Sequence, residues 1–323
     1  MPDDHRVVQH RWLRRVRNIL LGSVVFVVIL AIVGRLYEAI AEHRAASRCS
    51  MTGVRVDVGG YHLFLKCSGQ GSPAVILESG ALDSSRQWDK VQPEVAFVTR
   101  TCSYDRAGFG WSDPSRTPRT ARQMAVELHT ALVRAGVNPP YVMVGHSFGG
   151  LVTQLFSSLY PNEVVGLVLV DSVHPEEMSK FPDHFPPSSA IANFLRLTAP
   201  LGLPRFFGWC HPTAACPDCV KYTNAVLAEY DEYWESHQQA AAAAKLGNKP
   251  LAVLAHDPAV GLSGERDDAF EKAWTSWQQD LARRSTNSSL VVANGIGHEI
   301  QTDQPQLVIN AILRVIQASR SRP

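Results

Sequence analysis

The five residues from Gly145 to Gly149 read Gly-His-Ser-Phe-Gly, with a serine between two glycines. A short apolar run, 141–144, precedes them and a stretch with helical spacing, 151–160, follows. Glycines two residues to either side of a serine allow a strand and a helix to approach closely through a sharp, strained turn, which exposes the hydroxyl. We therefore predict that Ser147 is a nucleophile.

A serine hydroxyl is a weak nucleophile at neutral pH and needs a general base. The chain has 12 histidines, and one of them, His298, follows the last apolar run in the sequence Gly-Ile-Gly-His. His146 is adjacent to the serine in sequence, and we expect its side chain to point away from the nucleophile. We predict that His298 is the base.

The carboxylate that orients this histidine has two candidates. Asp171 closes the apolar run 165–170, and Asp257 follows the run 250–255. Either loop can bring a carboxylate to the second imidazole nitrogen, and the other aspartate then caps a turn or a helix. We prefer Asp171, because the loop of Asp257 is short and Pro258 restrains it; Asp257 stays the alternative.

Attack of the serine on a carbonyl creates an oxyanion, which two preorganised N–H groups must stabilise. The residue after the nucleophile, Phe148, is positioned to supply one of them. The loop Glu78-Ser79-Gly80-Ala81 follows another apolar run, 74–77. Because Gly80 permits a sharp turn there, we expect the Ala81 amide to be the second donor.

These residues all follow short β-like runs, which alternate with amphipathic helical stretches from residue 54 onward. That alternation predicts an α/β fold, with a mostly parallel eight-stranded sheet covered by helices on both faces. In such a sheet the site forms at the carboxyl ends of the strands. The expected strands are 54–58, 61–66, 74–77, 95–104, 141–144, 165–170, 250–255 and 289–293, and the expected helices are 121–135, 151–160, 266–284 and 305–318.

The alternation is interrupted at 174–248, which is rich in proline, aromatic residues and cysteine and then contains a helix-forming stretch, 222–246. We interpret it as a helical cap inserted between a first core segment, 53–173, and a second, 249–323. Its phenylalanine, tryptophan and leucine content suggests a substrate with an apolar acyl group.

The N-terminus is organised differently. Five arginines precede the uninterrupted apolar run 19–33, which extends to residue 36 if Arg35 is allowed. We predict a basic cytoplasmic segment, 1–18, a transmembrane helix, 19–36, and a linker, 37–52, with the catalytic domain on the non-cytoplasmic side because positive charge stays inside. A cleaved signal peptide ending near Ala39-Ile40-Ala41, which would make the protein secreted, is the alternative, although Arg35 and Glu38 argue against it.

The 31 Lys and Arg against 30 Asp and Glu give a net charge of +1, which argues against a nucleic-acid partner. Six cysteines permit disulfides in a non-cytosolic domain, and Cys67 and Cys102 lie on strands that can be neighbours. Cys210, Cys216 and Cys219 with His211 allow a zinc site, but their spacing matches no standard finger and oxidised thiols explain them as well. We predict no metal and no organic cofactor.

Four stretches together resemble the α/β-hydrolase superfamily, in particular its large bacterial group of uncharacterised serine hydrolases. They are Leu77 to Gly80, Tyr104 to Ser112 (Tyr-Asp-Arg-Ala-Gly-Phe-Gly-Trp-Ser), Gly145 to Gly149, and Gly297-His298 with Gln301 to Pro305. The resemblance runs from about residue 53 to 318. Many relatives have His-Gly where this chain has Ser79-Gly80, and the loop that matches Asp105-Arg106 is mainly structural in the family.

The resemblance implies a serine hydrolase that cleaves a carboxylic ester or related acyl bond of a small molecule through a Ser-His-Asp triad and an acyl-enzyme. A serine rather than an aspartate at position 147 argues against the dehalogenase and epoxide-hydrolase branches. Amidase, peptidase, thioesterase and cofactor-free haloperoxidase branches stay open. So does a ligand-binding protein of the same fold that has lost turnover.

Overall fold

A computed structural model of the chain describes residues 3–46, 52–182, 187–210, 218–262 and 268–321. From β1 to β8 the chain forms one eight-stranded sheet in the order β1-β2-β4-β3-β5-β6-β7-β8. The first hairpin and the β2–β4 pair are antiparallel, and all other neighbours are parallel. The strands are β1 Val54–Asp57, β2 His62–Ser68, β3 Ala74–Glu78, β4 Thr101–Asp105, β5 Tyr141–His146, β6 Val164–Val170, β7 Leu251–His256 and β8 Ser288–Ala293. The predicted α/β-hydrolase architecture is therefore confirmed.

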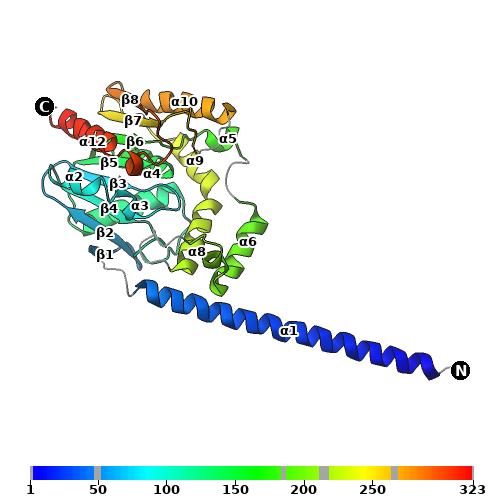
Figure 1. Cartoon of the computed structure of the whole chain (residues 1–323). Helices are drawn as coiled ribbons and strands as arrows, with labels where there is room; N and C mark the ends of the chain where they lie inside the picture. The colour runs from blue at the N-terminus through cyan, green and yellow to red at the C-terminus, as the bar shows by residue number, and fades with distance from the viewer. Residues whose placement is uncertain (1–2, 47–51, 183–186, 211–217, 263–267, 322–323) are drawn as a thin grey trace.

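Helices cover both faces of this sheet (Figure 1). Successive residues of a strand point to opposite faces, so Ile76 packs with one apolar cluster and its neighbours Val75 and Leu77 pack with the other. The first cluster includes α3 Ala121–Arg134, α4 Phe148–Leu159 and α10 Asp268–Ala282, and the second includes η1 Ser85–Trp88, α2 Gln92–Ala96, α11 Ile300–Asp303 and α12 Pro305–Arg320. The two layers fix the ends of β3, β5 and β6, from which the site is built.

Between β6 and β7 the chain forms a set of short helices, called the cap from here on. They are α5 Glu177–Lys180, α6 Ser189–Thr198, η2 Ala199–Leu201, α7 Leu203–Phe206, α8 Cys219–Asp231 and α9 Tyr233–Ala241. The helix-forming stretch 222–246 thus contributes to two helices, which are separated at Glu232, where the backbone leaves the helical region. Helix α9 contacts α3 and α4, so the cap lies against the same face as the first apolar cluster.

The strand expected over 95–104 begins later than its apolar pattern suggested. Residues Gln92–Ala96 form α2, which begins with Pro93 in its first turn, and β4 starts only at Thr101. Proline is favoured in the first turn of a helix, where no N–H donor is needed. Val95 is buried as a helical residue, so an apolar run that looked like a strand is divided between a helix and a strand.

The N-terminal helix α1 Asp3–Ala46 extends away from the rest of the molecule as a single rod (Figure 1). Its segment Trp12–Arg44 is long and apolar enough to cross a membrane, with a mean hydropathy of 2.7 over its most apolar window and none of that window buried in the protein. Helix continues through residue 46, so the first ten residues of the expected linker, 37–46, are part of α1. The last turns of α1 contact η2 of the cap.

Two disulfides lie in the described part of the chain. Cys67 and Cys102 are directly opposite each other on β2 and β4 and are bonded, as the sequence suggested. Cys210 is bonded to Cys219 in the cap, so oxidised thiols rather than zinc occupy two of the four residues considered for a metal. The other two, His211 and Cys216, lie outside the described residues, as does Cys49.

Candidate active site

Ser147 lies in the turn between β5 and α4 with φ 50° and ψ −124°. A positive φ is costly for a residue with a Cβ and persists only where the surroundings impose it. Strand β5 and helix α4 are close here, since a Cβ at Gly145 would lie 2.5 Å from Thr153 Oγ1. Helix α4 is also close to the loop after β3, since a Cβ at Gly149 would lie 2.4 Å from the Ser79 carbonyl oxygen. The glycines of the motif are therefore required by packing, and the turn exposes the Ser147 side chain at the N-terminus of α4.

Positive φ values cluster around this turn. Among the residues that the structure describes, Leu82, Ser147 and Asp171 are the non-glycine residues in the left-handed region. Leu82 follows the loop after β3, and Asp171 follows β6. Three strained residues thus gather at the carboxyl ends of three strands, where an open α/β sheet forms its site.

His298 and Asp171 are joined by a hydrogen bond of 2.6 Å from the imidazole Nδ1 to the carboxylate Oδ2. Asp171 is fully buried, whereas the His298 side chain is one-fifth exposed. Because Nδ1 is engaged by the carboxylate, the imidazole Nε2 is the nitrogen left to act on a substrate or a nucleophile. Of the two acids considered, Asp171 is the one in contact with His298.

Asp257 occupies a different place. Its carboxylate accepts hydrogen bonds from the backbone N–H groups of Ala259 at 2.9 Å and Gly295 at 2.8 Å. These two bonds hold the pKa of this exposed carboxyl below its usual value. Its backbone N–H also donates to the Ile296 carbonyl. Asp257 therefore closes a turn and braces the loop that leads to His298.

Asp171 has further partners that the sequence did not indicate. Its carboxylate accepts from His256 Nδ1 at 2.8 Å and from Trp274 Nε1 at 2.9 Å, as well as from the His256 backbone N–H at 3.0 Å. Burial raises the pKa of the Asp171 carboxyl, but hydrogen bonds from His256 and His298 outweigh it and hold the pKa well below its usual range. Asp171 is therefore ionised and fully hydrogen-bonded.

His256 connects this carboxylate to a second one. Its Nε2 lies 2.8 Å from Glu271 Oε2, so a fully buried imidazole is placed between Asp171 and Glu271. Burial lowers the pKa of His256, but its hydrogen bonds and charge interactions with the two carboxylates raise the pKa to about 9. The imidazole is therefore cationic at neutral pH and offsets the charge of Asp171.

His146 lies against the base, His298. Its ring centroid is 4.5 Å from that of His298, and its Nε2 is 3.1 Å from the His298 carbonyl oxygen, to which it donates. Complete burial, with the neighbouring His298, lowers the pKa of His146 to about 3. A neutral His146 thus supports the backbone of His298 without adding charge.

The two residues expected to supply the oxyanion donors line the same pocket. Phe148 is the first residue of α4, whose first N–H groups have no acceptor within the helix. Ala81 and Phe148 both line a narrow pocket between the sheet and the cap, together with Leu82, Val226, Glu229, Tyr230 and Tyr233. A Cβ on Gly80 would lie 3.3 Å from Ser147 Cβ, so the loop after β3 passes directly beside the serine.

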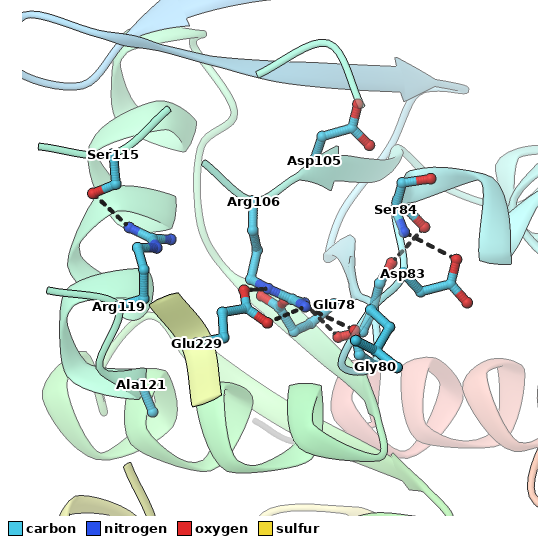
Figure 2. Close-up of polar contacts among 12 residues, drawn as sticks. Glu78, Gly80, Asp83, Ser84, Asp105, Arg106, Ser115, Arg119, Ala121 and Glu229 are labelled. Carbon is cyan, nitrogen blue, oxygen red and sulfur yellow. Dashed lines mark hydrogen bonds and ion pairs between the residues drawn. The ribbon is translucent and has the colours of Figure 1, made fainter. Parts of the chain in front are cut away.

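Arg106 holds that loop in place (Figure 2). Its guanidinium donates to the carbonyl oxygens of Ser79 at 2.6 Å and Gly80 at 2.7 Å, and to Glu78 at 2.9 Å. The same group binds Glu229 of the cap helix α8 through Nε at 2.7 Å and Nη2 at 3.1 Å. Because these carbonyls are fixed, the following Gly80–Ala81 peptide is fixed too, and the cap is tied to it.

The family model described as "Alpha/beta hydrolase family" matches residues 75–311, which include β3, the serine turn, the cap and the His298 loop. The chain belongs to this family. "Uncharacterized protein YqjL" of Bacillus subtilis is 28% identical over 249 residues, which cover 76% of this chain and 85% of that protein. "Probable transporter efuK" of Hormonema carpetanum is 32% identical over 81% of this chain, but this chain spans only 42% of its length. A crystal structure of DBJA superposes with a TM-score of 0.64 at 16% identity and covers 84% of this chain and all of that one.

In this alpha/beta hydrolase, one group of described residues has donor atoms close enough to hold a metal ion. His146, His298 and Glu299 offer ligand atoms within 4.8 Å of one another. The Glu299 carboxylate accepts from Gln87 at 3.3 Å and from Gln301 at 2.6 Å, and Nδ1 of His298 is engaged by Asp171, which leaves His298 Nε2 for the chemistry of the serine. We assign no metal to this site.

Proposed function

We propose that this alpha/beta hydrolase is a serine hydrolase that cleaves a carboxylic ester or related acyl bond, with Ser147 as nucleophile, His298 as base and Asp171 as the orienting acid. The observation that carries the proposal is the 2.6 Å bond between His298 and a buried, ionised Asp171 beside the strained serine turn. An aspartate in that turn would suit alkyl-group displacement, whereas a serine suits acyl transfer.

Each step has a residue suited to it. Ser147 Oγ attacks the carbonyl carbon while His298 Nε2 removes its proton, and the imidazolium that forms is stabilised by Asp171. The N–H groups of Phe148 and Ala81 bind the oxyanion. His298 returns the proton to the departing alcohol, which leaves an acyl group on Ser147. Water, deprotonated by His298, then attacks this acyl-enzyme and releases the acid.

We infer in addition that α1 anchors the enzyme in a membrane, with the catalytic domain on the non-cytoplasmic side. Arginines crowd the N-terminal side of the apolar segment, which favours a cytoplasmic N-terminus. Disulfides persist in oxidising compartments, and the two in this domain agree with that orientation.

Initial rates of ester hydrolysis by the full chain in lipid nanodiscs test the proposed chemistry. A panel of p-nitrophenyl esters and matched anilides should show turnover of the esters, and Ser147→Ala should abolish it. Ser319→Ala, in the last helix, is the matched control and should keep the wild-type rate. Activity that survives Ser147→Ala would contradict the proposal, and cleavage of anilides but not esters would move it to the amidase branch.

A further inference from the structure

The cap is fixed to α1 by contacts that leave little freedom. Glu38 of α1 is buried and accepts two hydrogen bonds from Arg205 of α7, from Nε at 2.8 Å and Nη2 at 2.7 Å. A Cβ at Gly34 would lie only 2.4 Å from the Leu201 carbonyl oxygen, so α1 and η2 touch backbone to backbone. The Arg205–Glu38 pair and the Gly34–Leu201 contact together fix the position of η2 and α7 along the axis of α1.

This position along α1 coincides with the end of the apolar run 19–33. Val33 is the last residue of the run, and Gly34 and Glu38 follow it. At 1.5 Å per helical residue, Glu38 lies about 7.5 Å beyond Val33. The interfacial layer on each side of a bilayer is about 5 to 8 Å thick. The predicted span, 19–36, is about 27 Å long at this rise, close to the thickness of the hydrocarbon core, so Glu38 and α7 lie at the boundary between the core and the lipid headgroups.

The helices at this level expose large apolar side chains. Leu197 of α6 is 76% exposed, Phe206 of α7 is 74% exposed and Phe207 is 68% exposed. Phe194 and Trp209 are more than half exposed as well. Large exposed apolar residues on one part of a protein can mark an interaction site, and membrane interfaces favour aromatic residues. These five residues, Phe194, Leu197, Phe206, Phe207 and Trp209, are called the cap apolar face from here on.

An apolar pocket borders this face. It has a volume of about 410 Å³, and its lining includes Trp209 of the cap apolar face and the apolar side chains Leu195 and Leu227. It shares Leu82, Val226 and Tyr230 with the narrow pocket that holds Ala81 and Phe148. The two pockets are thus adjacent, and the wider one is bordered by the exposed Trp209.

We propose that the cap apolar face is seated in the bilayer leaflet next to the C-terminal end of the α1 span, and that the enzyme takes from this leaflet an amphiphilic ester whose apolar chain enters through the 410 Å³ pocket. The membrane seat rests on α1 crossing the bilayer, and the substrate class rests on the proposed function of Ser147. The ester carbonyl then reaches Ser147 while the chain stays among apolar side chains. A lipid source also explains why the pocket is lined mainly by apolar residues and is bordered by an exposed tryptophan.

The fluorescence of Trp209 tests directly whether the cap apolar face lies in the bilayer. The full chain is reconstituted in phosphatidylcholine nanodiscs with and without lipids brominated on their acyl chains, and tryptophan quenching is compared among wild type, Trp209→Phe and Trp234→Phe. Trp234, on α9, is also exposed but lies outside the cap apolar face, so it is the matched control. The proposal predicts that quenching falls in Trp209→Phe and stays at the wild-type level in Trp234→Phe. Equal quenching in all three proteins would overturn the membrane seat, as expected if a soluble partner covers the face.

A second measurement tests the substrate. The ratio of turnover of a long-chain ester held in the nanodisc to that of a short water-soluble ester is compared between wild type and a Phe206→Asp, Phe207→Asp variant. We expect this ratio to fall at least tenfold, and to stay unchanged in Phe97→Asp, which alters an exposed phenylalanine after α2. An unchanged ratio in the double variant would overturn the bilayer as the source of substrate. If the wild type reacts with neither ester, the proposed function of Ser147 is contradicted instead. The quenching experiment then still tests whether the cap apolar face lies in the bilayer.

Discussion

The sheet side of the active site and the cap differ in how far their side chains are buried. On the sheet side, Asp171 and His256 are completely buried, and every polar atom of the Asp171 carboxylate has a donor within the protein. On the cap side, Phe206 and Leu197 are large apolar residues with most of their surface exposed. The polar groups of the first region are paired within the protein, whereas the apolar side chains of the second are the ones that we propose to lie in the bilayer. We therefore propose that the sheet carries the chemistry and that the cap apolar face selects the substrate.

The two aspartates give the largest contrast that mutation can test. Asp171→Asn keeps the shape of the site but leaves His298 without its charged partner, and comparable losses in serine triads are about 10⁴-fold in kcat. Asp257→Asn affects a turn and should change kcat less than threefold. Steady-state rates with one short ester measure both. Equal losses in the two variants would contradict the assignment of Asp171 as the acid.

Removing the charge beside Asp171 should cost less than removing Asp171 itself. His256→Gln keeps a donor near the carboxylate but no longer supplies a cation, and we expect kcat to fall about 10- to 100-fold, the effect of one charge-assisted hydrogen bond. His129→Gln, a partly buried histidine paired with Glu163, is the control and should keep the wild-type rate. A wild-type rate in His256→Gln would show that Asp171 needs only His298.

His256 also predicts how stability depends on pH. Its pKa is raised from 6.5 to about 9 in the folded protein, so the cation favours folding. This stabilisation is complete below about pH 6.5 and is lost as pH rises through about 9. The free energy of unfolding, measured by urea titration from pH 6 to 10, should therefore decline over this range in wild type. The decline should be smaller in His256→Gln, and an identical decline would exclude His256 as its source.

The two disulfides allow the same comparison in terms of stability. The Cys67–Cys102 bond closes a loop of 35 residues in the sheet, and its loss should lower the free energy of unfolding by about 4 kcal/mol by loop entropy. The Cys210–Cys219 bond closes 9 residues in the cap, for which the same relation gives about 2.6 kcal/mol. Paired serine variants and urea titration measure both. A larger loss from the cap bond would show that the cap, not the sheet, limits stability.

The smallest effect is expected where α1 meets the cap. Arg205→Gln removes one partner of the buried Glu38 and should loosen α7 and η2 without unfolding the sheet. Hydrogen exchange in nanodiscs should then increase in residues 199–206 and stay unchanged in β5 and β6. Faster exchange throughout the domain would indicate that the contact stabilises the whole protein.

The sequence predicted those features of the fold that depend on local chain geometry. Ser147 is set by two glycines, a strand and a helix that are all adjacent in sequence, and the Cys67–Cys102 pair follows from two neighbouring strands. The start of β4 was placed too early, because Val95 belongs to an apolar run whose pattern suits a strand, whereas Pro93 lies in the first turn of the helix α2. A proline in the first turn was the signal that could have corrected it.

Side-chain contacts between segments far apart in the chain could not be predicted from the sequence. The choice between Asp171 and Asp257 depends on which side chain reaches His298, a contact across 127 residues for Asp171. The bond from Arg106 to Glu229 joins residues 123 apart and connects the loop after β3 to the cap. The hydrophobic periodicity of the sequence does not identify such pairs, because each of these residues lies in a segment whose pattern is that of an ordinary strand, loop or helix.

The central claim is that the Asp171–His298 pair activates Ser147. Reaction of the full chain in nanodiscs with a fluorophosphonate, followed by peptide mass mapping, tests it most directly. The account predicts a single adduct on Ser147 that forms at least 100-fold more slowly in His298→Ala and Asp171→Asn and at the wild-type rate in Asp257→Asn. A folded protein that forms no adduct, or forms it on another serine, would contradict the account.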